Sequence, residues 1–437
     1  GLRHFFSVSS VPSVVNIPMT NSTSKSEAII PAETSDVVET MRAAHETRRP
    51  VFSLGGQTSL DYGGPPQRDG QSLDLTALNR IVDYTPRDMT IVVEPGLRMA
   101  DLAATLAAEG QQLPIDVPRA DEATVGGAVA TNWSGSRRYG YGTFRDYVIG
   151  IHAVDGRGIA FKGGGRVVKN VAGYDFCKLL TGSLGTLGVI TQLAFKVKPL
   201  AERATTIVAT CHDLATAEEM LRRLGELAAP PTAIDLLVGT TIDEIAGGTA
   251  APAAKPPAAT IVVRVEGTEP EVAWLGERVQ YELWGAAATS VHRLSDVAAE
   301  SLWARLNEFT DRGPYAAPDN SPLVLKFSIP PSAVVATIAD VRKHDPACTI
   351  LAHAASGIVV VRFANFEATD VNPVLVGQLR PAAARRGGTV VIVRTTFDGL
   401  TPHIHWGGRT EATVLAERIK HQFDPHGILN PGRFIYC

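Results

Sequence analysis

Three evenly spaced glycines constrain the fold of this chain more than any other feature. Gly182, Gly185 and Gly188 recur every third residue, and a run of β-branched residues begins at Val189. Glycine has no Cβ, so its backbone can pass close to a bulky group that other residues would hold away. The segment 166–190 therefore predicts either a loop between a short helix and a strand or a backbone contact with a ligand.

The composition describes an ordinary globular chain. Its 437 residues exceed one typical domain, and 45% of them are hydrophobic while 20% are charged. The net charge of −4, with no basic stripe, argues against a nucleic-acid partner. The four cysteines are scattered without a C-x-x-C pair, so the chain alone is not expected to hold an iron–sulfur cluster, and a reducing, cytoplasmic location is expected. No window is apolar enough to span a membrane directly.

The pattern of apolar residues, glycines and prolines predicts an α+β chain, and this sequence pattern changes near residue 200. Helices are predicted at 35–48, 99–109, 214–227 and 411–422, and strands at 51–54, 72–75, 90–94, 147–154, 159–161, 189–197, 261–265, 324–328, 358–363 and 389–394. We expect a disordered tail over 1–26, a first domain over 27–200, a second over 201–400 and a C-terminal helix and tail over 401–437. The Ala/Pro/Gly run 246–260 is expected to be a flexible loop.

The first motif that could carry chemistry lies at residues 53–60. A predicted strand runs into Gly55 and Gly56, and Gln57, Thr58 and Ser59 follow. Backbone N–H groups freed by a glycine turn form an anion-binding nest, and neighbouring hydroxyls add donors. The P-loop and G-x-G-x-x-G patterns are absent. The motif therefore predicts either a pyrophosphate loop or a polar surface turn.

Two further segments also have residues that could bind a ligand or form turns. Small residues dominate the first half of segment 125–146, hydroxyl and amide donors follow, and Arg137, Arg138 and Arg145 could offset phosphate charge. The alternative for these arginines is an ordinary solvated surface. Near the C-terminus, residues 424–433 read Asp-Pro-His-Gly-Ile-Leu-Asn-Pro-Gly-Arg, which is dense in turn residues for a segment that only frays.

The order and spacing of these segments resemble the flavoproteins of the vanillyl-alcohol oxidase superfamily. The resemblance covers residues 27–200 and 395–437 and is weaker between them. It implies a PCMH-type two-lobed FAD-binding domain, followed by an α+β substrate or cap domain, with the C-terminal tail returning to the flavin. Segments 169–175, 182–188, 352–358 and 387–392 resemble the glycolate oxidase FAD-binding subunit GlcE. The catalytic-type subunit GlcD usually has an acidic residue where Leu184 stands.

The resemblance also implies where FAD binds. Loop 53–60 would hold the pyrophosphate, and residues of 125–146 and 182–190 would line the rest of the cofactor. Because loop 53–60 contains neither histidine nor cysteine, we expect non-covalent FAD. The implied cofactor-binding residues are Ser53, Leu54, Gly55, Gly56, Gln57, Thr58, Ser59, Leu60, Pro95, Gly96, Val125, Gly126, Gly127, Thr131, Asn132, Ser134, Gly135, Arg138, Gly140, Gly182, Gly185, Thr186, Gly188, Val189, Ile190 and Asn430.

The catalytic residues are less constrained by the sequence. Relatives that oxidise D-lactate or 2-hydroxyglutarate carry a His-x-Gly-Asp-Gly-Asn-x-His segment and a Glu-His pair, and both are absent here. His403 and His405 could share one side of a strand and chelate a metal, but no carboxylate accompanies them, and a structural pair is the alternative. We therefore expect no metal site and take His353, Arg394 and His405 as candidate catalytic residues, with a core histidine as the alternative for His353.

The function that the resemblance implies is that of an FAD-binding subunit in a 2-hydroxy-acid (glycolate) dehydrogenase complex. Hydride would pass to FAD, or electrons would be relayed through it. The implied partners are a small 2-hydroxy acid, a catalytic FAD subunit and an iron–sulfur subunit, with membrane contact only through partners. The alternatives are a free-standing FAD-dependent oxidoreductase for another hydroxy acid or alcohol, and a catalytically silent scaffold.

Overall fold

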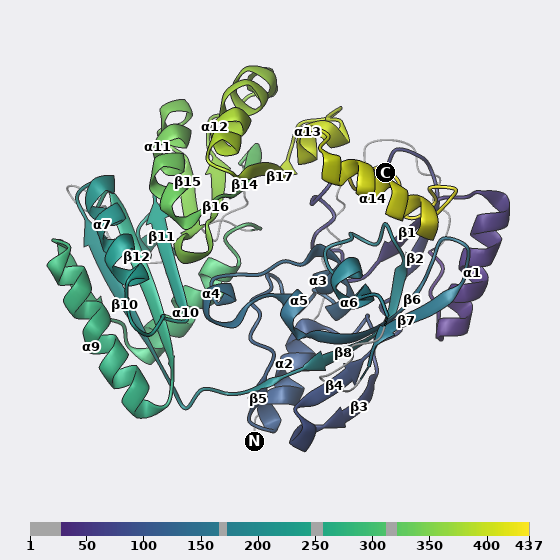
Figure 1. Cartoon of the computed structure of the whole chain (residues 1–437), viewed down its shortest axis with the longest axis horizontal. Helices are drawn as coiled ribbons and strands as arrows, with labels where there is room; N and C mark the ends of the chain where they lie inside the picture. The colour runs from purple at the N-terminus through teal and green to yellow at the C-terminus, as the bar shows by residue number, and fades with distance from the viewer. Residues whose placement is uncertain (1–27, 166–172, 246–256, 312–320, 437) are drawn as a thin grey trace, which may run out of the picture.

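The computed structural model describes residues 28–165, 173–245, 257–311 and 321–436 (Figure 1). Their mixture of helices and antiparallel sheets confirms the predicted α+β class. The predicted tail 1–26, most of the predicted loop 246–260 and the Lys169-Asn170 pair lie outside the described residues. Residues 259 and 260 belong to a strand instead of that loop.

The N-terminal half contains a five-stranded antiparallel sheet with the strand order β3-β4-β8-β6-β7. These strands are β3 (Ile81–Thr85), β4 (Thr90–Val93), β8 (Val189–Lys196), β6 (Val148–Val154) and β7 (Ala160–Gly164). A separate parallel pair joins β1 (Val51–Leu54) to β2 (Gln71–Asp74), and α1 (Thr34–Thr47) packs on it with Val37 and Met41 fully buried. The short helices and strands of this half are η1 (Pro86–Asp88), α2 (Met99–Ala108), β5 (Gln111–Gln112), α3 (Val125–Thr131), α4 (Arg138–Tyr141), α5 (Phe144–Tyr147), α6 (Phe176–Leu180) and β9 (Lys198–Pro199).

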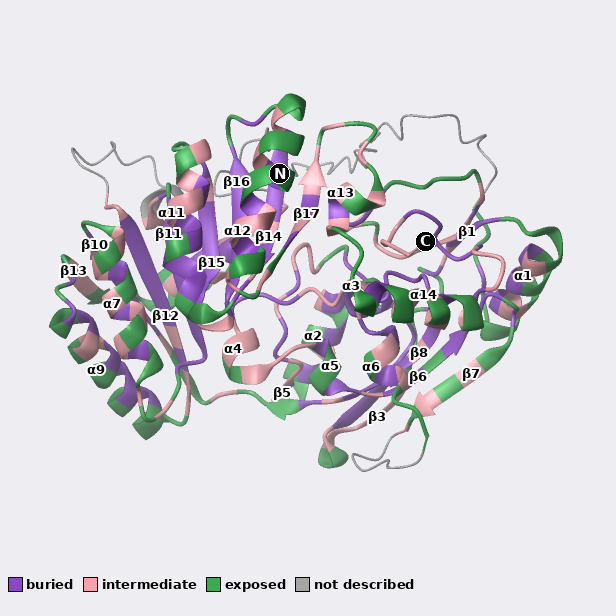
Figure 2. Cartoon of the chain, turned by 45° about the horizontal axis from the view of Figure 1, so that its top comes forward, coloured by how far each residue is buried: buried purple, intermediate pink, exposed green. Residues whose placement is uncertain are grey.

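The second half is built on an eight-stranded antiparallel sheet with the order β13-β10-β12-β11-β15-β16-β14-β17. Its strands are β13 (Ser290–Arg293), β10 (Arg203–Cys211), β12 (Ala259–Gly267), β11 (Ala233–Val238), β15 (Thr349–His353), β16 (Ile358–Phe363), β14 (Leu323–Ser328) and β17 (Thr389–Thr395). The central strands are buried along their length, whereas the surrounding helices expose their outer sides (Figure 2).

Helices cover one face of this sheet, and the other face turns toward the N-terminal half. Buried side chains of α7 (Leu214–Gly225), α9 (Glu269–Gly285), α11 (Val334–His344) and α12 (Arg380–Arg385) form one core with the sheet. On the opposite face, α10 (Asp296–Asn307) shares an apolar cluster with Tyr62 and Leu184 of the N-terminal half. The remaining elements are α8 (Ile242–Ile245), η2 (Pro331–Ala333), η3 (Ala354–Ser356), η4 (Ala368–Asp370), the π-helix η5 (Val371–Leu379), α13 (Pro402–Trp406) and α14 (Glu411–Phe423).

Two segments form helices that the sequence did not predict. Segment 125–131 forms α3, and the Thr124 hydroxyl caps it by accepting a hydrogen bond from the Gly127 N–H. Gly126 is required there because a Cβ would lie 2.5 Å from the side chain of Pro95. His403 and His405 lie in the helix α13 and not in a strand, so they do not share one face.

Candidate cofactor site

A cavity of about 340 Å³ lies where β1, α3, the glycine-spaced segment and the C-terminal tail meet. Its lining includes Ser53, Leu54, Gly55, Gly56, Gln57, Thr58, Ser59, Leu60, Pro95, Gly126, Gly127, Thr131, Gly185, Gly188, Ile190 and Asn430, all of which the sequence predicted as cofactor-binding residues. These residues come from segments up to 377 positions apart, and the fold brings them to one hollow. Their assignment to FAD remains a prediction that the placement supports.

The two glycines of the 53–60 loop are required by contacts within the chain. A Cβ on Gly55 would lie 2.2 Å from the Thr124 hydroxyl, and one on Gly56 would lie 1.8 Å from the carbonyl oxygen of Glu122. The loop can therefore press against residues 122–124 only if both positions lack a side chain. At these two positions the close neighbour of the backbone is protein.

The residues of this loop also line the cavity. The N–H groups of Gly55, Gly56, Gln57 and Thr58 donate to no other described residue. Free backbone N–H groups of a glycine turn can form a nest for an anion. The loop therefore has the donor set that a pyrophosphate needs, which fits FAD.

The glycine-spaced segment makes a left-handed turn beside this loop. Gly182 and Gly185 have φ values of 82° and 68°, and Leu184 between them has φ 53° although it carries a branched side chain. A Cβ on Gly185 would lie 2.5 Å from the Asn430 amide nitrogen. The spacing is thus explained by backbone conformation and contact with the tail, while Gly188 also lines the cavity.

The C-terminal tail closes the cavity with two polar side chains. The Asn430 amide donates to the Leu184 carbonyl at 2.7 Å and accepts from the Ser53 N–H at 3.1 Å. Arg433 donates to the carbonyls of Ser59, Leu60, Tyr62 and Gly64, so one guanidinium fixes the chain that follows the loop. Loss of hydration lowers the pKa of Arg433 to about 10, which leaves it charged at neutral pH.

The remaining predicted cofactor residues lie outside the lining of this cavity. Val125 and Val189 are fully buried in cores, and Gly135 and Gly140 pack against Asp116 and Thr232. Arg138 donates to the Ser134 hydroxyl at 3.1 Å. Asn132 ends α3, and its side chain lies near Gly182. The Thr186 carbonyl accepts a hydrogen bond from Lys420 near the C-terminus. Gly96 lines a neighbouring hollow, whose lining also includes Gly55, Gly56 and Gln57.

Sequence reasoning missed several lining residues. They are Phe52, Pro66, Gly70, Ser72, Leu75, Thr124, Ala130, Leu184 and Arg433. Two had a signal in the sequence, because Thr124 precedes a run of small residues as a helix cap would, and Arg433 ends the Asn-Pro-Gly-Arg motif. Leu184 had none, because nothing in its local sequence predicts a left-handed leucine.

None of the three candidate catalytic residues is part of the cavity lining. The His353 Nδ1 lies 2.9 Å from the Asp235 carboxylate, which also accepts a hydrogen bond from the Ser136 hydroxyl. This buried trio joins the eight-stranded sheet to the N-terminal half. The Ser136 hydroxyl lies 3.4 Å from the same Nδ1 atom that faces Asp235, so the imidazole does not stand between serine and carboxylate as it does in a catalytic triad.

The other two candidates lie nearer the tail. Arg394 donates to the Asp311 carbonyl at 2.8 Å, and burial lowers its pKa. His405 is 5% exposed, and burial, with the charges of Arg433 and Arg380, lowers its pKa to about 4. It is therefore a neutral imidazole at physiological pH.

A lysine that the sequence did not single out lies on the sheet face opposite the helices. Lys326 of β14 donates to the Tyr62 hydroxyl at 3.1 Å, and its ammonium lies 5.0 Å from the ring centroids of both Tyr62 and Trp133. Tyr62 shares an apolar cluster with the cavity-lining Leu184. The fold thus places a cation against two aromatic rings, one of which belongs to the same apolar cluster as a cavity-lining residue.

Comparison with protein families identifies the chain's class. Residues 26–163 match the FAD binding domain family, and residues 200–434 match the C-terminal domain of FAD linked oxidases. The second match covers more than half of the chain, so the chain belongs to the FAD-linked oxidases. Its cofactor is FAD, as the sequence predicted.

Individual relatives refine this picture. The glycolate oxidase subunit GlcD of Bacillus subtilis (strain 168) is 26% identical over 93% of this chain and 88% of its own length. The glycolate oxidase subunit GlcE of Escherichia coli (strain K12) is 37% identical, but over 37% of this chain and 46% of its own. The solved structure of p-cresol methylhydroxylase with substrate bound has a TM-score of 0.72 at 15% identity, covering 93% of this chain and 88% of that one, which confirms the PCMH-type fold.

Two further findings concern the described parts of the chain. Within them, no group of three histidine, cysteine, aspartate or glutamate side chains is placed to hold a metal ion. None of their helices is both long and apolar enough to cross a membrane.

Proposed function

We propose that this chain is an FAD-binding subunit of a complex that oxidises a small 2-hydroxy acid of the glycolate type. Two relatives are named as subunits of glycolate oxidase. The higher identity to GlcE and the leucine at position 184 support the FAD-binding subunit over the catalytic-type one.

The observation that carries this proposal is the position of the Lys326 ammonium against the rings of Tyr62 and Trp133. Its hydrogen bond to Tyr62 uses one of three N–H donors, which leaves donors for the carboxylate of a hydroxy acid. The rings of Tyr62 and Trp133 enclose the ammonium and lower the local polarity, which strengthens a pairing between lysine and carboxylate. A small acid anchored there would lie beside Leu184, at the wall of the cofactor cavity.

The roles of the chain's own residues follow from these contacts. When bound, FAD would supply the hydride acceptor for oxidation of the carbon that bears the hydroxyl group. Lys326 binds and orients the acid, and Tyr62 and Trp133 exclude water from it. Asn430 and Arg433 hold the loops that surround the cofactor.

Partners are needed to carry the electrons onward. The cysteines that the structure describes at 177, 211 and 348 are buried singly, and burial raises the pKa of Cys177 and Cys211 to about 11. An iron–sulfur subunit and a catalytic FAD subunit therefore remain our proposed partners. A cytoplasmic location, with membrane contact through these partners, remains a prediction of the sequence.

The test is anaerobic reduction of the bound flavin. Glycolate and D-lactate are added to the purified chain, with and without co-expressed glycolate oxidase partner subunits, and the visible absorbance of the flavin is followed. Lys326→Met should raise the acid concentration needed for half-maximal reduction at least tenfold, since a charged hydrogen bond contributes about 1.5–3 kcal/mol. Lys343→Met, which removes an exposed ammonium paired with Asp340, is the control.

The outcomes separate the alternatives. Bleaching only with partners supports the complex, and bleaching of the isolated chain supports a free-standing oxidoreductase for that acid. Flavin that neither acid reduces in any assembly would contradict the proposal and favour the silent scaffold.

A further inference from the structure

Leu184 is a cavity-lining residue in a conformation that its side chain does not favour. Its φ of 53° lies in the left-handed region, which branched residues rarely adopt unless the surroundings impose it. Its N–H donates to the Ala130 carbonyl at 2.9 Å, and its carbonyl accepts from the Asn430 amide at 2.7 Å. The tail therefore supplies one of the two backbone hydrogen bonds that hold this residue at the cavity.

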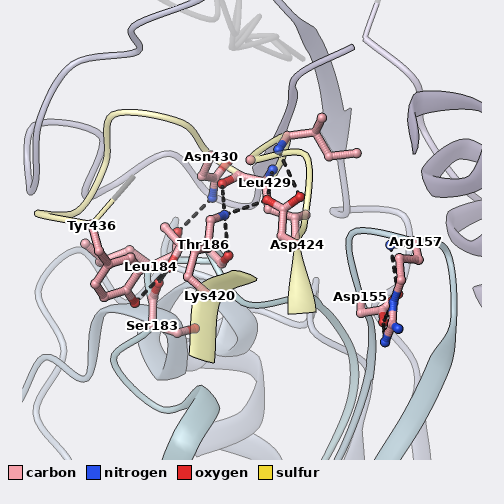
Figure 3. A network of polar contacts seen from close by, with 12 residues as sticks. Asp155, Arg157, Ser183, Leu184, Thr186, Lys420, Asp424, Leu429, Asn430 and Tyr436 are labelled. Atoms are coloured by element: carbon pink, nitrogen blue, oxygen red, sulfur yellow. Dashed lines mark hydrogen bonds and ion pairs between the residues drawn. The ribbon is translucent and has the colours of Figure 1, made fainter. Parts of the chain in front are cut away.

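A buried ammonium fixes the tail in that position. Lys420 of α14 is 5% exposed and donates to the Thr186 carbonyl at 2.7 Å, to the Leu429 carbonyl at 3.0 Å and to the Asp424 carboxylate at 2.6 Å (Figure 3). All three of its N–H donors are thus matched. One side chain joins the helix, the tail and the glycine-spaced segment at a point two residues after Leu184.

Asp424 completes the arrangement at the start of the tail. Its carboxylate is 2% exposed and accepts hydrogen bonds from the N–H groups of Ile428 and Leu429 at 3.0 and 2.7 Å. Figure 3 shows Lys420 between this turn and Thr186, with Asn430 reaching Leu184 beside it. A charge pair this deeply buried is stable only while every partner stays in place.

These contacts form one connected set that ends at the cavity. We propose that residues 420–433 act as a clasp whose docking is coupled to FAD binding, with Lys420 as its positioning residue. The docked clasp holds Leu184 and Asn430 in the cavity wall, so it favours bound FAD. By linkage, bound FAD must favour the docked clasp to the same extent.

The first test measures cofactor affinity in a positioning variant. Lys420→Met should raise the dissociation constant of FAD at least tenfold, measured by titrating FAD-stripped protein. Asp345→Asn is the matched control, because Asp345 is 1% exposed and also accepts backbone N–H bonds, but in a loop of the eight-stranded sheet. The control should lower the melting temperature and leave the FAD affinity unchanged. A Lys420→Met protein that loses stability as the control does, with unchanged FAD affinity, would overturn the proposal.

The second test uses the unaltered chain and so does not depend on how a variant folds. Amide hydrogen exchange is compared between FAD-loaded and FAD-stripped protein. Coupling predicts that exchange over residues 424–433 slows at least tenfold when FAD is restored, while exchange in α11, on the far face of the eight-stranded sheet, stays the same. Equal exchange of the tail in both forms would refute the clasp. Because neither test uses a hydroxy acid, their outcome is independent of the proposed substrate.

Discussion

Acid should destabilise this fold through one buried imidazole. Burial, aided by the charges of Arg433 and Arg380, lowers the pKa of His405 from 6.5 to about 4. Below pH 6.5 the unfolded chain binds a proton at this residue that the folded chain does not bind, so the unfolded state is stabilised relative to the folded state as pH falls. The stability that depends on neutral His405 is therefore fully present above pH 6.5, is lost progressively between pH 6.5 and 4, and changes no further below that.

The size of the effect follows from the shift. A displacement of roughly 2.5 pKa units corresponds to roughly 3 kcal/mol of unfolding free energy, a substantial part of the 5–15 kcal/mol typical of a domain. Urea denaturation followed by tryptophan fluorescence should be measured between pH 7.5 and 4 for the native chain and for His405→Gln. The difference between the two proteins isolates this residue, because the other titrating groups are common to both.

The expected result is a native chain that loses about 3 kcal/mol relative to His405→Gln across this range. His403→Gln, on the exposed side of the same helix, is the matched control substitution. A difference between the native chain and His405→Gln that stays constant with pH would refute the reasoning, since it would mean that the imidazole titrates alike in both states.

Three further predictions concern the cavity and its supports. Gly56→Ala should weaken FAD binding at least tenfold in a cofactor titration, because its Cβ would lie 1.8 Å from the Glu122 carbonyl; Gly225→Ala, which meets no atom within 4 Å, should not. Arg433→Met should cost about 1.5–3 kcal/mol in urea denaturation, because carbonyls from Ser59 to Gly64 lose their charged donor, and full stability would contradict this structural role. His353→Asn should lower the melting temperature while the rate of flavin reduction changes only a few-fold, because His353 contacts Asp235; complete loss of reduction in a folded protein would instead support a catalytic role.

Local sequence patterns predicted the elements whose apolar residues are the ones that the fold buries. The strand at 358–363 is found as predicted because its β-branched residues are flanked by turns and all six positions are buried. In contrast, α3 was missed because Gly126 and Gly127 oppose helix formation, and the packing of Gly126 against Pro95 overrides that preference.

The cofactor loops were predictable for a related reason. Residues 53–60 carry their own donors, so a short stretch of sequence is enough to indicate an anion site. Lys326 was not, because its partner Tyr62 lies 264 positions away and nothing near either residue signals the contact. The buried contact of Lys420 with Thr186, across 234 positions, was invisible for the same reason. Functions that depend on such distant pairs require the fold.

The central claim is that this chain holds FAD and passes electrons to it from a small 2-hydroxy acid. Anaerobic titration with glycolate, followed by flavin absorbance, tests it most directly. We predict a yellow protein whose flavin bleaches with glycolate when the partner subunits are present, at a much higher glycolate concentration in Lys326→Met. A colourless protein, or flavin that glycolate never reduces in the assembled complex, would contradict the account.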